Sequence, residues 1–284
     1  MPRPPSPPQI PHPPKKANKH LSLIALLMLS LYSSMAMAEP PPRVVVSAAP
    51  LHSLVASLME GVTSPVLLDD STDAQPAQLG PFGKSQLMTA DMVIWSDTGL
   101  AKAMTQAMEG IPLKGQLLTL SEHVPLLTEE GVTNAPVFHH QSRVPEFWHD
   151  PRLAIIAVRM ITPRLVKLDP EHQERYLDNE IVLVKRLKNL EQEISTQLKP
   201  GSGQIYAAIS GLNPYFSHRF LPSAAHPEQE GFQKASLNEP AACAYGRDTT
   251  RYNIGPALYF ETMRYITRQV STCLHTPDQK QLAL

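Results

Sequence analysis

Short apolar runs alternate with amphipathic stretches between residues 43 and 120. The runs are rich in Val, Ile and Leu, which is typical of strands buried on both faces of a sheet. They predict strands at residues 43–48, 64–68, 91–96 and 115–120. The stretches between them predict helices at residues 50–59, 83–90 and 100–109. Strands that alternate with helices of about ten residues indicate βαβ units and a parallel sheet.

The hydrophobic period becomes that of long helices between residues 150 and 200. An Asp-Pro pair at residues 150–151 is a good N-cap and first turn, and predicts a helix at residues 151–168. Pro163 lies inside this helix and is expected to kink or interrupt it. A second Asp-Pro pair, at residues 169–170, opens another helix that runs to about Leu198. Its apolar residues recur every three or four positions, at Leu177, Ile181, Val184, Leu187, Leu190, Ile194 and Leu198.

This second helix is long for a small domain, because at about 1.5 Å per residue it extends about 43 Å. Such a length suits a rod that joins two lobes. Beyond it, residues 204–209 predict a strand, and residues 213–220 and 256–274 predict helices. Residues 121–148 have no period and predict a loop. The expected fold class is α/β, with two small lobes of mainly parallel sheet joined by one long backbone helix.

The N-terminal segment has the pattern of a secretory signal. Three lysines between residues 15 and 19 precede an apolar run at residues 21–32, and Ala36-Met37-Ala38 fits a signal peptidase site. The apolar run is shorter than the ~20 residues that span a bilayer. We therefore expect cleavage after about Ala38, a periplasmic location and no membrane insertion of the mature protein.

The charge of the mature chain narrows the classes of macromolecular partner. Without residues 1–38 the chain has 21 Lys and Arg against 26 Asp and Glu. This acidic balance argues against nucleic acid or an anionic membrane as a partner, since both require a basic surface.

Cys243 and Cys273 are the only cysteines. In an oxidising compartment a disulfide between them is expected, with two free thiols as the alternative.

Motifs of enzymes are missing from the sequence. It has no G-x-S-x-G elbow, no H-E-x-x-H pair, no phosphate-binding glycine loop and no Cys/His nucleophile arrangement. We therefore expect a protein that is not an enzyme and that has no organic cofactor.

Five segments carry a resemblance to a known family. They are VVVSAAPLHSLVASLMEGV (44–62), LMTADMVIWSDTGLAKAM (87–104), PEFWHDPRLA (145–154), LDP (168–170) and GPALYFETMRYITRQVSTCL (255–274). In this order they resemble the substrate-binding proteins of zinc and manganese ABC importers, of the zinc-uptake type. The binding proteins for siderophores and cobalamin match less well, because they lack the W-x-D-P block. The resemblance implies a monomeric periplasmic protein that delivers a divalent metal ion, zinc or manganese, to an inner-membrane ABC permease.

The resemblance also divides the chain into parts. It implies a signal peptide at residues 1–38, an N-terminal α/β lobe with a His-containing loop at 39–149, a helix pair with the long linker helix at 150–200, and a C-terminal α/β lobe at 201–284. The last lobe is expected to be shortened, because Asp248 comes only 38 positions after Ser210. The disulfide between Cys243 and Cys273 ties this shortened segment to the closing helix.

Family members usually bind the ion with three histidines and a carboxylate, a donor set that suits zinc or manganese. The resemblance places these four positions at Gln75, Glu146, Ser210 and Asp248. Three histidines are thus replaced, and only the aspartate is kept. Three alternatives stay open: zinc binding at these four positions, an altered site that uses Glu146, Asp248 and a neighbouring histidine, and a cleft without metal.

The nearby histidines are further candidates. His139 and His140 lie in the loop where zinc-specific relatives carry histidine-rich runs, and His149 follows Glu146 by three residues. His52 starts the first helix and is expected to face the cleft edge, whereas His218 and His226 are expected at the surface. Two functions therefore compete: a metal carrier, or an accessory or scaffold protein on the same fold that contacts a transporter or another periplasmic partner without carrying an ion.

Overall fold

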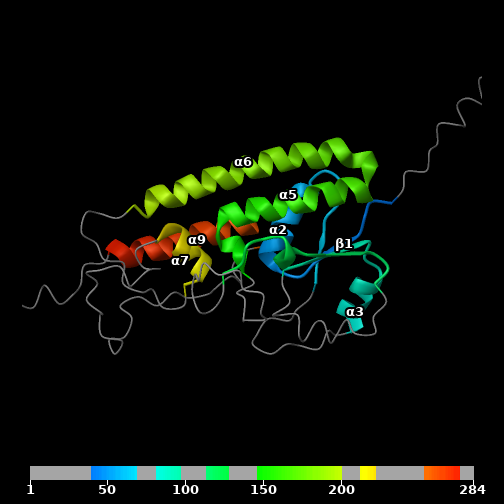
Figure 1. Ribbon diagram of the computed structural model, residues 1–284, viewed down its shortest axis with the longest axis horizontal. Helices are drawn as coiled ribbons and strands as arrows, with labels where there is room; N and C mark the ends of the chain where they lie inside the picture. The colour runs from blue at the N-terminus through cyan, green and yellow to red at the C-terminus, as the bar shows by residue number, and fades with distance from the viewer. Residues whose placement is uncertain are drawn as a thin grey trace, which may run out of the picture. The chain divides into compact units, whose positions relative to one another are not determined.

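The four apolar runs form one parallel sheet in the computed structural model (Figure 1), which describes residues 40–68, 81–96, 113–127, 146–199, 212–221 and 253–275. The strands are β1 (Val44–Val46), β2 (Val66–Leu67), β3 (Met92–Trp95) and β4 (Gln116–Thr119), in the order β2-β1-β3-β4. Val45 lies at the centre, since it pairs with Val66 on one side and with Val93 on the other. The predicted parallel α/β arrangement is confirmed.

Side chains of β1 alternate between two apolar clusters. Val44 and Val46 belong to the main core, which includes α2 (Ala49–Leu58), whereas Val45 packs with Leu87 of α3 (Pro81–Met88) in a smaller cluster. All three valines are fully buried. Burial on both faces is the reason that this strand is a continuous valine run. The helix expected at residues 100–109 and the strand expected at 204–209 lie outside the described residues.

Two helices, α5 (Pro151–Leu168) and α6 (Gln173–Gln197), run antiparallel side by side (Figure 1). Asp150 is the N-cap of α5, and its side chain accepts a hydrogen bond from the backbone N–H of Arg152 at 2.8 Å. The interruption expected at Pro163 does not occur, because α5 continues through it. Pro163 is exposed, so water can bind the carbonyl that this proline leaves without its helical donor.

The long helix is confirmed, with one difference in its first turns. A 3-10 turn, η3 (Pro170–His172), precedes the 25 residues of α6, which extend about 38 Å. Its apolar stripe is buried at Leu183, Leu187, Leu190 and Ile194, where α6 contacts α2, α5 and α9. The first residues of the predicted stripe are not buried, since Ile181 is 69% exposed.

The C-terminal helix packs on elements from the first part of the chain. α9 (Leu258–His275) contacts both α2 and α6. Tyr259 donates its backbone N–H to Ser53 Oγ at 3.0 Å, and Ser57 donates its hydroxyl to the Pro256 carbonyl at 3.3 Å. The described elements from Pro41 onward therefore form one compact unit.

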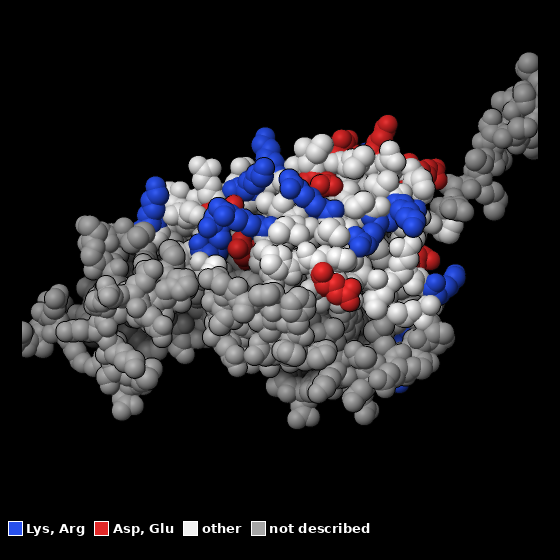
Figure 2. Space-filling view, in the orientation of Figure 1, with Lys and Arg blue, Asp and Glu red and all other residues white. Residues whose placement is uncertain are grey.

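Charge is spread unevenly over this unit. Helix α5 carries four basic side chains and no acidic ones, at Arg152, Arg159, Arg164 and Lys167. Figure 2 shows Lys and Arg side chains interspersed with Asp and Glu over the helical face. The acidic balance of the mature sequence is thus not reproduced locally on α5.

Among the described helices, none combines the length and apolar character that crossing a bilayer demands.

His52 is buried rather than at a cleft edge, which corrects the expectation from the sequence. Its side chain is 6% exposed, and Nε2 donates to the Pro65 carbonyl at 2.9 Å. This bond puts the proton on Nε2, so Nδ1 is unprotonated, and it has no hydrogen-bond partner among the described residues. Burial lowers the pKa of His52 below its ordinary value of 6.5, with the hydrogen bond to Pro65 opposing this shift.

We expect the free energy of unfolding to fall as the pH drops through 6.5. The folded pKa of His52 is lowered, so the folded state disfavours the proton that the unfolded state accepts below that pH. Urea unfolding at a series of pH values measures the effect. His52→Gln keeps a donor for the Pro65 carbonyl and does not titrate, so its stability should vary less with pH. An unchanged pH profile in His52→Gln would assign the effect to other groups.

Candidate functional site

Glu146 directly precedes a buried turn. It is the N-cap of η2 (Phe147–His149), a 3-10 turn that leads into α5 and lies within the segment expected to be a loop. Phe147 is fully buried and Trp148 is 5% exposed, with their rings edge to face at 5.5 Å. These aromatic side chains anchor the turn in the core, so the backbone of Glu146 is held in place.

The carboxylate of Glu146 is held by an amide from another helix. Asn213 Nδ2 donates to Glu146 Oε2 at 2.8 Å. Asn213 is also the N-cap of α7 (Pro214–Phe220), where its Oδ1 accepts from the backbone N–H of Tyr215 at 2.9 Å. Within the described residues the other carboxylate oxygen of Glu146 has no hydrogen-bond partner.

His149 lies close to Glu146 but is bound to its backbone. Its Nδ1 donates to the Glu146 carbonyl at 3.0 Å, and its ring lies 6.1 Å from that of Trp148. A nitrogen that carries a proton for this bond has no lone pair for a metal ion. In this geometry His149 therefore does not bind a cation through Nδ1.

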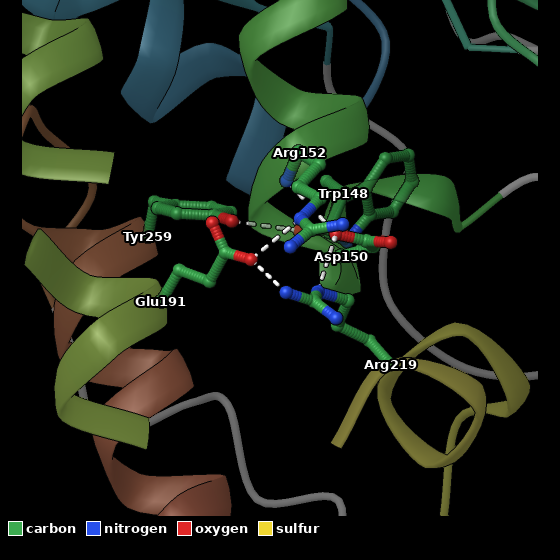
Figure 3. Close-up of polar contacts among 6 residues, drawn as sticks. All are labelled: Trp148, Asp150, Arg152, Glu191, Arg219 and Tyr259. Carbon is green, nitrogen blue, oxygen red and sulfur yellow. Dashed lines mark hydrogen bonds and ion pairs between the residues drawn. The ribbon is translucent and has the colours of Figure 1, made fainter. Parts of the chain in front are cut away.

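A group of ionised side chains joins α7 to α5 and α6 (Figure 3). Arg219 of α7 donates to Glu191 Oε1 of α6, and Arg152 Nε of α5 donates to the same oxygen at 2.6 Å. Arg219 Nε also lies 4.0 Å from Oδ1 of Asp150. The side chains of Arg219, Glu191 and Asp150 are 23%, 16% and 13% exposed. Water screens the attraction between ion pairs at this depth less than it screens pairs at the surface.

Burial raises the pKa of both carboxylates in this group, but the net pKa shift is downward for Glu191 and upward for Asp150. Burial raises the pKa of Glu191, but the hydrogen bonds from Arg219 and Arg152 outweigh it, so the net pKa is lowered. Burial also raises the pKa of Asp150, and there it exceeds the opposing effects of the Arg152 N–H and the nearby arginines. Glu191 is therefore the firmly ionised partner of both arginines.

Tyr259 fixes the turn from the side of α9. Its hydroxyl donates to the Trp148 carbonyl at 2.8 Å (Figure 3). Burial raises the pKa of Tyr259 well above its ordinary value, and the charge of Asp150 adds to this shift. The phenol thus stays protonated and able to donate. The turn after Glu146 is consequently held by α9, while its carboxylate is held by α7.

The structure places two of the seven expected site residues, Glu146 and His149. The other five lie outside the described residues: Gln75, His139, His140, Ser210 and Asp248. Within the described ranges no three His, Cys, Asp or Glu side chains cluster to hold a metal ion. Cys243 also lies outside them, as does the side chain of Cys273, so the disulfide stays a prediction. His218 is exposed, as expected, and His226 is outside the described ranges.

Sequence reasoning missed Asn213 and Arg219. The Asn-Pro pair at residues 213–214 is a recognisable helix start, yet an N-cap signal does not reveal which distant carboxylate the amide contacts. Glu191, one partner of Arg219, lies 28 residues away on α6, and Asp150, the other, is the N-cap of α5. Neither spacing has a sequence pattern of its own.

Comparisons with known proteins agree with the fold and extend along nearly the whole described unit. The model of the ZnuA family, "zinc-uptake complex component A periplasmic", matches residues 44–271. The high-affinity zinc uptake system protein ZnuA of Brucella abortus is 22% identical over 245 residues, covering 73% of each chain. The protein of that name from Yersinia pestis is 28% identical over 217 residues, covering 67% of this chain and 68% of the relative.

Solved structures show the same fold. A crystal structure of ZnuA aligns with a TM-score of 0.54 and 17% identity, covering 63% of this chain and 68% of that one. A zinc-bound ZnuA deletion mutant gives the same TM-score and identity, with 63% and 67% covered. The segments matched by the family model include β1, the long helix α6 and most of α9. The chain therefore belongs to the ZnuA family of periplasmic zinc-uptake components.

Proposed function

We propose that this protein is the periplasmic zinc-binding component of an ABC importer, and that zinc is its cargo. The observation that carries the proposal is the family match over residues 44–271, which spans the sheet, the turn at Glu146 and the backbone helix. The geometry supports it at one point, because the Glu146 carboxylate is held by Asn213 with one oxygen left for a cation. A carboxylate oxygen is an accepted zinc donor.

The proposed ligand set combines Glu146 with side chains that other segments supply. Asp248 is the second carboxylate of the set, and a histidine from the 139–140 pair is its nitrogen donor. Gln75 and Ser210 occupy the remaining family positions, but they offer neutral oxygens that bind zinc weakly. His149 contributes at most through its second nitrogen, since Nδ1 bonds to the Glu146 carbonyl.

The remaining features of the proposal concern export and partners. Residues 1–38 act as a cleaved signal peptide, the mature protein works as a monomeric carrier rather than an enzyme, and an inner-membrane permease receives the ion. Residues 39–149, 150–200 and 201–284 form the first lobe, the helix pair and the shortened second lobe. A disulfide joins Cys243 to Cys273 in the oxidising periplasm.

Metal titration of the mature, chelator-stripped protein tests the proposal. Zinc at 100 times its Kd adds about 2.7 kcal/mol to the free energy of unfolding, which raises the Tm of a protein of this size by about 5–10 °C. Manganese is titrated in parallel, and magnesium is the control. A shift with manganese but not zinc would correct the cargo. No shift with either metal would contradict a carrier and favour the accessory protein without an ion.

A further inference from the structure

We propose that Arg219 is a positioning residue for the zinc ligand Glu146. By pinning α7 to α5 and α6, it keeps Asn213 against the Glu146 carboxylate. The inference rests on the proposed function, because it assigns Glu146 to the metal. It goes further because it names a residue near the C-terminal end of α7, away from Asn213, that affects the zinc affinity of the site.

The first step is the anchored end of α7. Arg219 is the penultimate residue of the helix, and its guanidinium donates to Glu191 on α6 while facing Asp150 at the start of α5. Figure 3 shows Arg219 reaching from α7 towards the carboxylates of both neighbouring helices. Phe220 adds an apolar contact, since its ring packs on that of Phe216 at 4.9 Å and both rings are buried. The C-terminal end of α7 is thus fixed by charge and by packing.

The second step concerns the N-terminal end of α7, where Asn213 contacts Glu146. Asn213 is 7% exposed and uses both ends of its amide, donating to Glu146 and accepting from the N–H of Tyr215. Its orientation is therefore set by the direction of α7. A seven-residue helix is only about 10 Å long and moves as a rigid piece, so tilting one end displaces the other.

The third step is the consequence for binding. A ligand whose rotamer is fixed by a hydrogen bond loses less conformational entropy when the ion binds. Tyr215 also holds α7, because its hydroxyl accepts from the N–H of Leu127 at 2.7 Å. Losing Arg219 should therefore weaken zinc binding rather than abolish it. Outer partners of metal ligands typically account for 10–100-fold in affinity, and we expect about tenfold here.

The experiment compares zinc affinity among variants by calorimetry against a competing chelator, at a temperature where circular dichroism shows each to be folded. Arg219→Met should raise the Kd for zinc about tenfold, and Arg219→Lys, which keeps one charge for Glu191, should recover part of the loss. Asn213→Ser keeps the N-cap but is too short to reach Glu146, and should match Arg219→Met. Arg264→Met is the control, because it breaks an exposed Arg–Glu pair between α9 and the same helix α6.

Coupling to Glu146 separates positioning from general stability. In a Glu146→Ala background, which removes the acceptor for Asn213, Arg219→Met should leave the Kd for zinc within about twofold, although it still lowers the Tm. A wild-type Kd in Arg219→Met, or the same tenfold loss in the Glu146→Ala background, would overturn the inference and leave the proposed function standing. A wild-type protein that binds neither zinc nor manganese would overturn both.

Discussion

Replacing Glu146 with alanine is expected to weaken zinc binding about 100-fold, or about 2.7 kcal/mol. Glu146 is the one described residue of the expected ligand set whose side chain presents an oxygen without a hydrogen-bond partner in the described part of the chain. The alanine variant removes that donor together with its negative charge. Competition calorimetry with zinc measures the change in Kd.

Three further variants decide how the loss arises. Glu146→Gln keeps an oxygen acceptor for Asn213 but loses the charge, so its affinity should fall between wild type and alanine. Glu146→His supplies the imidazole that the family resemblance implies for this position, and should keep the Kd within about tenfold of wild type. Glu174→Ala removes an exposed carboxylate from the first turn of α6 and should change nothing. Unchanged zinc affinity in Glu146→Ala would remove this residue from the site.

The fold could be predicted from the sequence where burial imposes a period. The apolar runs that became β1 and β3 are buried on both faces, so composition alone identifies them, although the strands are shorter than the apolar runs. The long helix was predicted from its three-to-four-residue stripe. The stripe did not show that Ile181 is exposed, because exposure depends on which helices lie opposite each turn. At Pro163 the expected interruption does not occur, since its solvent-facing position lets the helix continue.

The candidate site could be predicted only in part. Resemblance points to Glu146, because a W-x-D-P block fixes its place in the chain. The residues that hold it come from contacts between helices far apart in sequence, such as Asn213, 67 residues away. His52 illustrates the opposite error, in which a position at a helix start suggested a cleft. The start of α2 instead lies against the carbonyl of Pro65, and the histidine is buried there.

Truncating Leu187 to alanine is expected to lower the free energy of unfolding by about 2–5 kcal/mol. Leu187 is fully buried in the main core at the centre of α6, the helix that contacts α2, α5 and α9. The lost methyl groups leave a cavity that rigid helices on several sides cannot fill. Since single domains are stable by only about 5–15 kcal/mol, urea unfolding should show a large fall in the transition midpoint.

Ile181→Ala is the matched control, since it truncates an aliphatic residue of the same helix that is 69% exposed, and its effect should stay within about 0.5 kcal/mol. The comparison tests more than one side chain. If α6 is a structural rod whose buried half carries the core, the cost depends on position along the helix and not on residue type. Equal losses at both positions would mean that the N-terminal half of α6 is covered in solution, and that the exposed face at Ile181 has a partner.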